Sequence, residues 1–131
     1  MPISIVPFYA ALLAGFYIFL SVRVIRMRVR ERIAVGDGGN RRLRRAIRVH
    51  ANFAEYVPLA LILTAFVELQ QSAPIIVHGL CLSLLLGRIC HAYGVSQENE
   101  DHRFRVAGMA MTFATISGSA LLLAGSFLLR P

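Results

Sequence analysis

The segment that decides the fold is "RAIRVHANFAEYVPLAL", residues 45–61, where arginines and other polar residues run directly into an apolar stretch. A helix needs about 20 mostly apolar residues to cross the hydrocarbon core of a bilayer. The uncharged run Tyr56–Val67 is shorter than that. A spanning helix over residues 43–69 is long enough if its first turns carry these polar residues. The segment therefore predicts a transmembrane helix with a polar face at one membrane surface.

Composition places the whole chain in a membrane. Of its 131 residues 56% are hydrophobic, and the mean hydropathy is +0.62, more apolar than a water-soluble domain needs. Three further uncharged runs are each long enough to span a bilayer, at residues 2–22, 69–87 and 106–129. The run at residues 2–22 has neither the basic residues at its start nor the cleavage site of a signal peptide, so we interpret it as a membrane-spanning helix. We predict a single all-α membrane domain over residues 1–131, with four transmembrane helices at about residues 4–28, 43–69, 74–93 and 102–129.

The distribution of charge predicts the orientation. The net charge is +7 and comes from 14 arginines without a lysine, ten of them between Arg23 and Arg48. A soluble protein of this charge would suggest a nucleic-acid partner, but here the cluster lies between two hydrophobic helices. The positive-inside rule explains it better. We therefore predict no nucleic acid, cytoplasmic loops between helices one and two and between helices three and four, and both termini outside.

Local signals mark the ends and contacts of these helices. The sequence "VGDGGN", residues 35–40, is typical of a turn and separates the first two helices. Pro58 is expected to bend the second helix, and Pro74 to open the third. The fourth carries small residues at spacings of three and four that favour close helix packing in a membrane. They follow Arg105 and are Gly108, Thr112, Thr115 and Ser119.

A polar stripe runs along the start of the second helix. At about 100° per residue, its members fall within one arc of roughly 100°. They are Arg45, Arg48, Asn52, Glu55 and Tyr56. The stripe from Arg48 to Glu55 is about 10 Å long, comparable to a short peptide. His50 points away from Asn52, which indicates a packing role.

The chemistry of this stripe favours a zwitterionic, peptide-like ligand. Arginine guanidinium groups suit carboxylate or phosphate, Asn52 offers a donor and an acceptor, and Glu55 suits an ammonium group. The alternative is that Arg48 and Glu55 pair within the bundle, or that the arginines anchor the helix at the membrane surface. Against it, charges at membrane depth are costly and are functional candidates by default.

Two other helices bring basic groups to the same end. The sequence "GRICHAYG", residues 87–94, places Arg88 and His91 on one face of the third helix, and Arg105 heads the small-residue stripe of the fourth. Cys81 and Cys90 are nine residues apart on one helix, about 13 Å along its axis, which is too far for a disulfide. No cysteine motif for a metal is present in the sequence.

These residues together resemble a known family. The pattern R-x-x-R-x-H-x-N-x-x-E-x-x-x-P, from Arg45 to Pro58, resembles the MAPEG family, the membrane-associated proteins in eicosanoid and glutathione metabolism. The resemblance covers nearly the whole chain through "GDGGN", "GRICHAYG" and "FRVAGMAMT", and looks like a bacterial branch. It implies an inner-membrane homotrimer of four-helix protomers that holds glutathione between adjacent subunits near the cytoplasmic face.

The resemblance also assigns residues. The motif positions that contact glutathione match Arg48, Asn52, Glu55 and Tyr56, with Arg88 and His91 on the third helix, and Arg45 joins them from the polar stripe. Arg28 or Arg30 matches a further contact at the end of the first helix. An arginine early in the fourth helix activates the thiol in relatives. Arg103 and Arg105 are the two candidates for this role, and Arg105 is preferred because it shares the small-residue face of the fourth helix.

This membership implies a glutathione transferase or peroxidase of the detoxification type. Its thiolate would attack a hydrophobic electrophile or a lipid hydroperoxide entering from the membrane lipids, with glutathione as co-substrate and no metal. Two departures argue against eicosanoid synthesis. Val95 stands where the eicosanoid-synthesising relatives carry a tyrosine, with Tyr93 out of register, and Val106 replaces the polar partner that follows the arginine of the fourth helix in the prostaglandin-isomerase branch.

Other functions stay open. The same fold could bind a lipid headgroup or a small anionic metabolite through these arginines without catalysis. A bundle of this kind could also hold haem between His50 and His91. A channel or transporter is disfavoured because the sequence lacks paired midplane charges and discontinuous helices.

Overall fold

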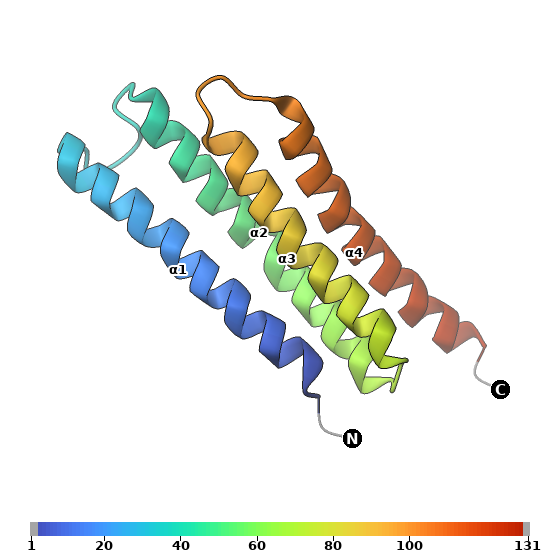
Figure 1. Ribbon diagram of the computed structural model, residues 1–131. Coiled ribbons are helices and arrows are strands. Elements are labelled where there is room, and N and C mark those ends of the chain that lie inside the picture. The colour runs from blue at the N-terminus through green and yellow to red at the C-terminus, as the bar shows by residue number, and fades with distance from the viewer. Residues whose placement is uncertain (1–2, 130–131) are drawn as a thin grey trace.

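The computed structural model describes residues 3–129, which form a bundle of helices (Figure 1). The helices are α1 (Ile5–Glu31), α2 (Arg41–Leu69), α3 (Pro74–Ser96) and α4 (His102–Leu128). All four are long and apolar enough to cross a membrane. Even the shortest, α3, has 23 residues, or about 35 Å, against a hydrocarbon core of about 30 Å. The prediction of an all-α chain with four helices of spanning length is confirmed.

The two central helices carry the bundle. The helix pairs whose backbones approach each other are α1–α2, α1–α3, α2–α3, α2–α4 and α3–α4, whereas the backbones of α1 and α4 stay apart within residues 3–129. The α1–α2 and α3–α4 loops lie at one end of the molecule, and the start of α1 and the end of α4 lie at the other (Figure 1). We call the first the arginine-rich end and the second the distal end.

Three helix ends differ from those expected from the sequence. Helix α1 continues to Glu31 rather than residue 28, because arginines favour helix and the chain turns only at Arg32, which adopts the left-handed conformation (φ 55°). Helix α2 begins two residues early, at Arg41, because the Asn40 side chain accepts a hydrogen bond from the Leu43 N–H at 3.0 Å. Helix α3 extends to Ser96 instead of residue 93.

The turn predicted before α2 is built from glycines and one carboxylate. Gly38 and Gly39 have positive φ, and a Cβ on Gly38 would lie 2.7 Å from the side chain of Ile33. Asp37 accepts a hydrogen bond from the Gly39 N–H at 2.9 Å and pairs with Arg44. The bond from Arg44, followed by the bond from Gly39, lowers the pKa of Asp37. These contacts hold the turn against the first residues of α2.

The start of α1 is capped from a distant part of the chain. Helix α1 has no side-chain cap of its own. The carboxylate of Glu68, at the end of α2, accepts hydrogen bonds from the N–H groups of Ser4, Ile5 and Val6 at 2.7, 2.8 and 2.8 Å. These are donors that an α-helix leaves unpaired, and the negative charge also suits the positive end of the helix dipole. Glu68 therefore fixes α1 against α2 at the distal end.

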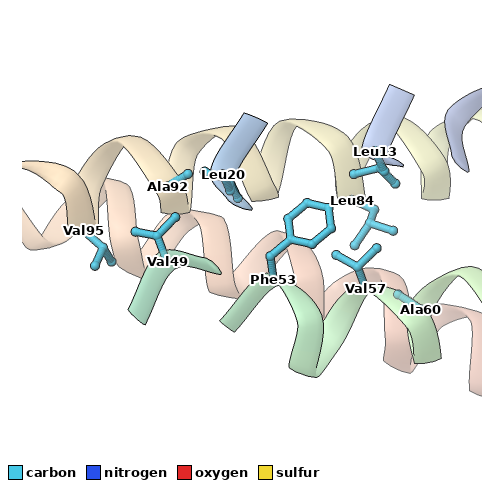
Figure 2. Packing of buried hydrophobic residues seen from close by; sticks show 9 residues of the cluster. All are labelled: Leu13, Leu20, Val49, Phe53, Val57, Ala60, Leu84, Ala92 and Val95. Carbon is cyan, nitrogen blue, oxygen red and sulfur yellow. The ribbon is translucent and has the colours of Figure 1, made fainter. Parts of the chain in front are cut away.

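Buried apolar side chains hold the helices together in two clusters. In the larger one Phe53 of α2 lies between residues of α1 and α3 (Figure 2). The smaller one lies at the distal end and includes Val6, Val67, Val77 and Cys81. The members of the larger cluster are Leu13, Leu20, Val49, Phe53, Val57, Ala60, Leu84, Ala92 and Val95.

Helices α3 and α4 pack with their backbones in close contact. A Cβ placed on Gly108 would lie 2.5 Å from the carbonyl oxygen of Gly87 and 2.6 Å from the backbone nitrogen of His91. Farther along α4, the small residues predicted to face a neighbouring helix are fully buried; they are Thr112, Thr115 and Ser119. The small-residue stripe therefore lets α4 approach α3 and sets the position of His91 relative to the start of α4.

We expect Gly108→Ala to lower the thermal stability of the detergent-purified protein. The new methyl group would meet backbone atoms of Gly87 and His91 and the Cβ of His91, none of which can move aside by rotation of a side chain, and overpacking of this kind costs about 1 to 3 kcal/mol. Gly125→Ala is the matched control, because nothing lies within 4 Å of a Cβ at that position on the same helix. The measurement is the melting midpoint followed by helical ellipticity. Equal midpoints for the two variants would contradict the close α3–α4 contact.

Candidate functional site

A cavity of about 320 Å³ lies at the arginine-rich end, between α2, α3, α4 and the α3–α4 loop. We call it the arginine cavity. Its volume lies within the range of small-molecule sites, roughly 300 to 1,000 Å³. Its walls contain five arginines and a single carboxylate. The lining residues are Arg41, Arg44, Arg45, Arg48, Asn52, His91, Val95, Glu100 and Arg105.

Helix geometry brings most of these groups together. Arg41, Arg45, Arg48 and Asn52 follow one another at spacings of four, three and four, so they share one face of α2. This face is the first part of the stripe predicted from the sequence. Helix α3 adds His91, whose exposed fraction is only 4%. The cavity therefore offers permanently charged donors on one side and an imidazole on another.

Glu100 is the carboxylate of the cavity. Its side chain is 8% exposed, and its Oε2 accepts a hydrogen bond from Arg45 at 3.0 Å. Arg45 also donates to the carbonyl oxygen of Val95 at 3.0 Å. Arg105, with 55% of its side chain exposed, lies 3.6 Å from Glu100 Oε1. Glu100 thus neutralises part of the positive charge that α2 and α4 bring to the cavity.

The ionisation of Glu100 follows from these neighbours. Burial alone would raise its pKa, but the hydrogen bond from Arg45 and the charges of Arg105, Arg45 and His102 outweigh burial and lower the pKa below its ordinary value. Glu100 is therefore charged at neutral pH. Its negative charge is held inside a group of cations and competes with any anion that enters the cavity.

Arg88 lies beneath the cavity and supports it. Its side chain is only 1% exposed. One nitrogen donates to Asn52 Oδ1 at 2.7 Å, and a second contacts the sulfur of Met109 at 3.3 Å. Within residues 3–129 the Nε of Arg88 is buried without a hydrogen-bond partner. Arg88 therefore orients the Asn52 amide and adds positive charge behind the cavity wall.

Two residues of α2 that were predicted to contact glutathione, Glu55 and Tyr56, lie outside the cavity of the single chain. Glu55 is exposed, and Tyr56 packs edge-on against Phe113 of α4 with ring centres 5.6 Å apart. Neither lines the arginine cavity, although both lie on the same arc of α2 as Arg48; the lining on this helix ends at Asn52, about one turn before them. Their predicted contact with glutathione stays a prediction that requires a second subunit.

The remaining predicted arginines are also separate from the cavity. Arg28 donates to backbone carbonyls of the α1–α2 loop, including Gly36 at 2.8 Å. Arg30 lies 3.9 Å from Glu31 on the exposed side of α1. Of the two contenders on α4, Arg105 lines the cavity and Arg103 does not. The geometry of the single chain thus favours Arg105 over Arg103.

His50 serves packing, in agreement with its predicted direction. Its Nε2 lies 2.9 Å from Ser21 Oγ, and its ring stacks on Tyr17 with centres 4.8 Å apart. These contacts point it towards α1, whereas His91 lines the cavity on the other side of α2. Within residues 3–129 no group of three His, Cys, Asp or Glu residues could hold a metal ion.

Comparison with known proteins identifies the family. The chain matches the model of the MAPEG family over residues 6–125. This chain belongs to the MAPEG family. It is also similar to the inner membrane protein YecN of Escherichia coli K12, with 38% identity over 108 residues that cover 82% of this chain and 81% of YecN. YecN of Escherichia coli O6:H1 (strain CFT073) shows the same identity and coverage.

Membership in MAPEG makes the chain an integral membrane protein and gives the cavity a context. The match includes α2, α3 and most of α4, and so all the residues that line the arginine cavity. Glu100, in contrast, was not a site residue predicted from the sequence. It stands in a loop with Glu98 and Asp101 as acidic neighbours, and only the path of this loop shows which carboxylate faces the arginines.

We expect Glu100→Gln to lower the stability of this MAPEG protein at neutral pH and to weaken its loss of stability in acid. Because the folded pKa of Glu100 is lowered, its stabilisation is present above the ordinary value of 4.5 and is lost as pH falls through the folded pKa. The change at neutral pH should be about 1.5 to 3 kcal/mol, the range of a hydrogen bond to a charged group. Denaturation midpoints in detergent, measured between neutral and acid pH, test this.

Glu98→Gln is the matched control for this experiment. Glu98 lies in the same loop and pairs with Arg42 at 2.9 Å, but its side chain is 47% exposed. The solvent screens such a pair, so its contribution is small. A Glu98→Gln variant that changed the acid profile as much as Glu100→Gln would show that burial of Glu100 is not the cause.

Proposed function

We propose that this protein binds glutathione in the arginine cavity and activates its thiol for transfer or peroxidase chemistry. The observation that carries the proposal is the excess of five arginines over one carboxylate in a cavity of small-molecule size. Glutathione carries two carboxylates, one ammonium group and a thiol. An excess of cations suits a ligand with a net negative charge, above all once its thiol has ionised.

The α2 face supplies the groups for the two ends of such a ligand. Arg45 and Arg48 lie one turn apart and can form paired hydrogen bonds with a carboxylate. Asn52 presents an amide that can contact the peptide backbone of glutathione, and the bond from Arg88 holds this amide in place. The carboxylate of Glu100 already shares Arg45 and Arg105, so the ligand carboxylate would compete for these two arginines.

Assembly into a homotrimer is part of this proposal. The ammonium group of glutathione needs an anion, and Glu55 is the group on α2 that suits it, although it is exposed outside the cavity. An adjacent subunit could bring the exposed side of α2 to a bound ligand, and with it Tyr56. The same arrangement would allow Arg28 or Arg30 of a neighbouring α1 to take part.

Arg105 is the group proposed to favour the thiolate. A guanidinium stabilises the charged form of a nearby thiol and so lowers its pKa. A decrease of about two units corresponds to roughly 2.7 kcal/mol. The thiolate would form a thioether by displacing a leaving group from a hydrophobic electrophile. Alternatively, it would attack the terminal oxygen of a lipid hydroperoxide and break the O–O bond, which gives the lipid alcohol and glutathione sulfenic acid; a second glutathione then converts the sulfenic acid into glutathione disulfide and water. Glu100 lies 3.6 Å from Arg105 and opposes this effect by partly neutralising it.

The proposed location is the bacterial inner membrane, with the arginine-rich end in the cytoplasm. The name of YecN as an inner membrane protein supports the membrane, and the positive-inside rule supports the orientation. Both termini would then lie outside. A cytoplasmic cavity has access to soluble glutathione, while the apolar surfaces of the helices give access to lipids.

A second function is favoured by the exposure of Arg105. Because 55% of its side chain is exposed and it pairs with Glu100, solvent and a counterion both reduce its effect on a thiol. The same cavity could bind a small anionic metabolite or a lipid headgroup without activating anything. Binding without thiolate formation would distinguish this function from the first.

We expect glutathione added to the detergent-purified protein to give the ultraviolet absorbance of a thiolate at neutral pH. Arg105→Ala should remove most of this signal, because a loss of roughly 2.7 kcal/mol of preferential stabilisation returns the thiol to its protonated form. Arg103→Ala is the control, since this arginine lies two residues away and does not line the cavity. A thiolate signal that is lost in Arg103→Ala and kept in Arg105→Ala would reverse the assignment.

A further inference from the structure

A second basic groove lies on the other side of the arginine-rich end, between α1 and the start of α2. Its volume is about 400 Å³, and it shares no residue with the arginine cavity. We call it the α1 groove. Most of its lining belongs to the last three turns of α1. The lining residues are Phe19, Val22, Arg23, Arg26, Met27, Arg30, Glu31, Asn40 and Arg42.

The groove changes from apolar to cationic along the helix axis. Phe19, Arg23, Arg26 and Arg30 follow at spacings of four, three and four, so they share one face of α1. Phe19 is 59% exposed and lies about 10 Å from Arg26 along the axis. In a bilayer this spacing places the aromatic ring among acyl chains when the arginines reach the headgroup layer.

Two arginines of the groove keep an uncompensated charge. Arg23 donates to the hydroxyl of Ser96 at 2.6 Å, which fixes its guanidinium beside the groove instead of letting it extend into water. Neither Arg23 nor Arg26 pairs with a carboxylate among residues 3–129. In contrast, Arg42 is neutralised by Glu98 through contacts of 2.9 and 3.3 Å. The positive charge of the groove that has no counterion within the described part of the chain is therefore that of Arg23 and Arg26 on α1, which lie nearer the arginine-rich end than Phe19.

We propose that the α1 groove binds an anionic phospholipid from the leaflet at the arginine-rich end. Its phosphate diester lies against Arg23 and Arg26, and its acyl chains follow the exposed apolar surface of Phe19 and Val22. A soluble phosphate would match the arginines but would leave the apolar part of the groove without a ligand. The complementarity in both charge and polarity thus selects a lipid. This binding does not depend on glutathione.

The test compares lipid retention by native mass spectrometry of the full protein released from detergent. The probes are phosphatidylglycerol and phosphatidylcholine with identical acyl chains. The wild-type protein should retain phosphatidylglycerol preferentially, and Arg26→Gln should weaken its binding about fivefold, as expected for one arginine near an anionic lipid surface. Arg32→Gln is the matched control, because it removes an exposed arginine of the same end that does not line the groove.

Any one of three outcomes would overturn the proposal. Equal retention of the two lipids would show that the headgroup charge is not recognised. Equal losses in Arg26→Gln and Arg32→Gln would show a general surface attraction without a site. Displacement of phosphatidylglycerol by the same concentration of inorganic phosphate or deacylated headgroup would show a site for soluble anions. Helical ellipticity of both variants in detergent checks that they fold.

Discussion

Many positive charges are concentrated at one end of an apolar bundle, and the need to compensate the least exposed of them organises the arginine-rich end. A cation taken out of water needs an anion or several hydrogen-bond acceptors. The α1–α2 loop provides carbonyl oxygens for Arg28 and the carboxylate of Asp37 for Arg44. The α3–α4 loop provides Glu98 and Glu100. Both loops thus act as counterions for the starts and ends of the helices they connect.

The same constraint shows where ligands fit. Arg48 lines the cavity and forms no ion pair among residues 3–129, and Arg23 and Arg26 of the α1 groove form none either. An anion from solution or from the membrane would supply the counterion that these three arginines lack among the described residues. The two places differ in their surroundings. The cavity is lined mainly by charged and polar residues of three helices and a loop, whereas the lining of the groove includes exposed apolar side chains such as Phe19. This difference favours a soluble ligand in the cavity and a lipid in the groove.

Close packing of α3 and α4 gives the cavity its shape. Gly87 and Gly108 allow the two backbones to touch, and one turn beyond Gly87 is His91 in the cavity wall. Near the loop, a Cβ on Gly94 would lie 2.8 Å from the backbone nitrogen of Arg105. Glycine at these positions therefore determines how near Arg105 comes to α3 and to His91 on it.

Much of this arrangement could be predicted from the sequence because its causes are local. Apolar runs predicted the helices, "GDGGN" the turn, and the spacing on α2 brought Arg45, Arg48 and Asn52 to one face. Contacts between distant segments could not be predicted in this way. The cap of α1 by Glu68 joins residues more than 60 positions apart, and the entry of Glu100 into the cavity depends on the path of a loop. Nor does spacing alone show that Glu55, which lies on the same face of α2 as Arg48, does not line the cavity.

If the arginine cavity holds glutathione by charge, binding depends on ionic strength and on Arg48, and equilibrium dialysis measures both dependences. Labelled glutathione is dialysed against the detergent-purified protein at low and high salt, with Arg48→Ala beside the wild type. We expect saturable binding that weakens as salt rises and falls at least tenfold in Arg48→Ala, by more than about 1.4 kcal/mol. An absence of saturable binding at millimolar glutathione, or equal binding by both proteins, would contradict it.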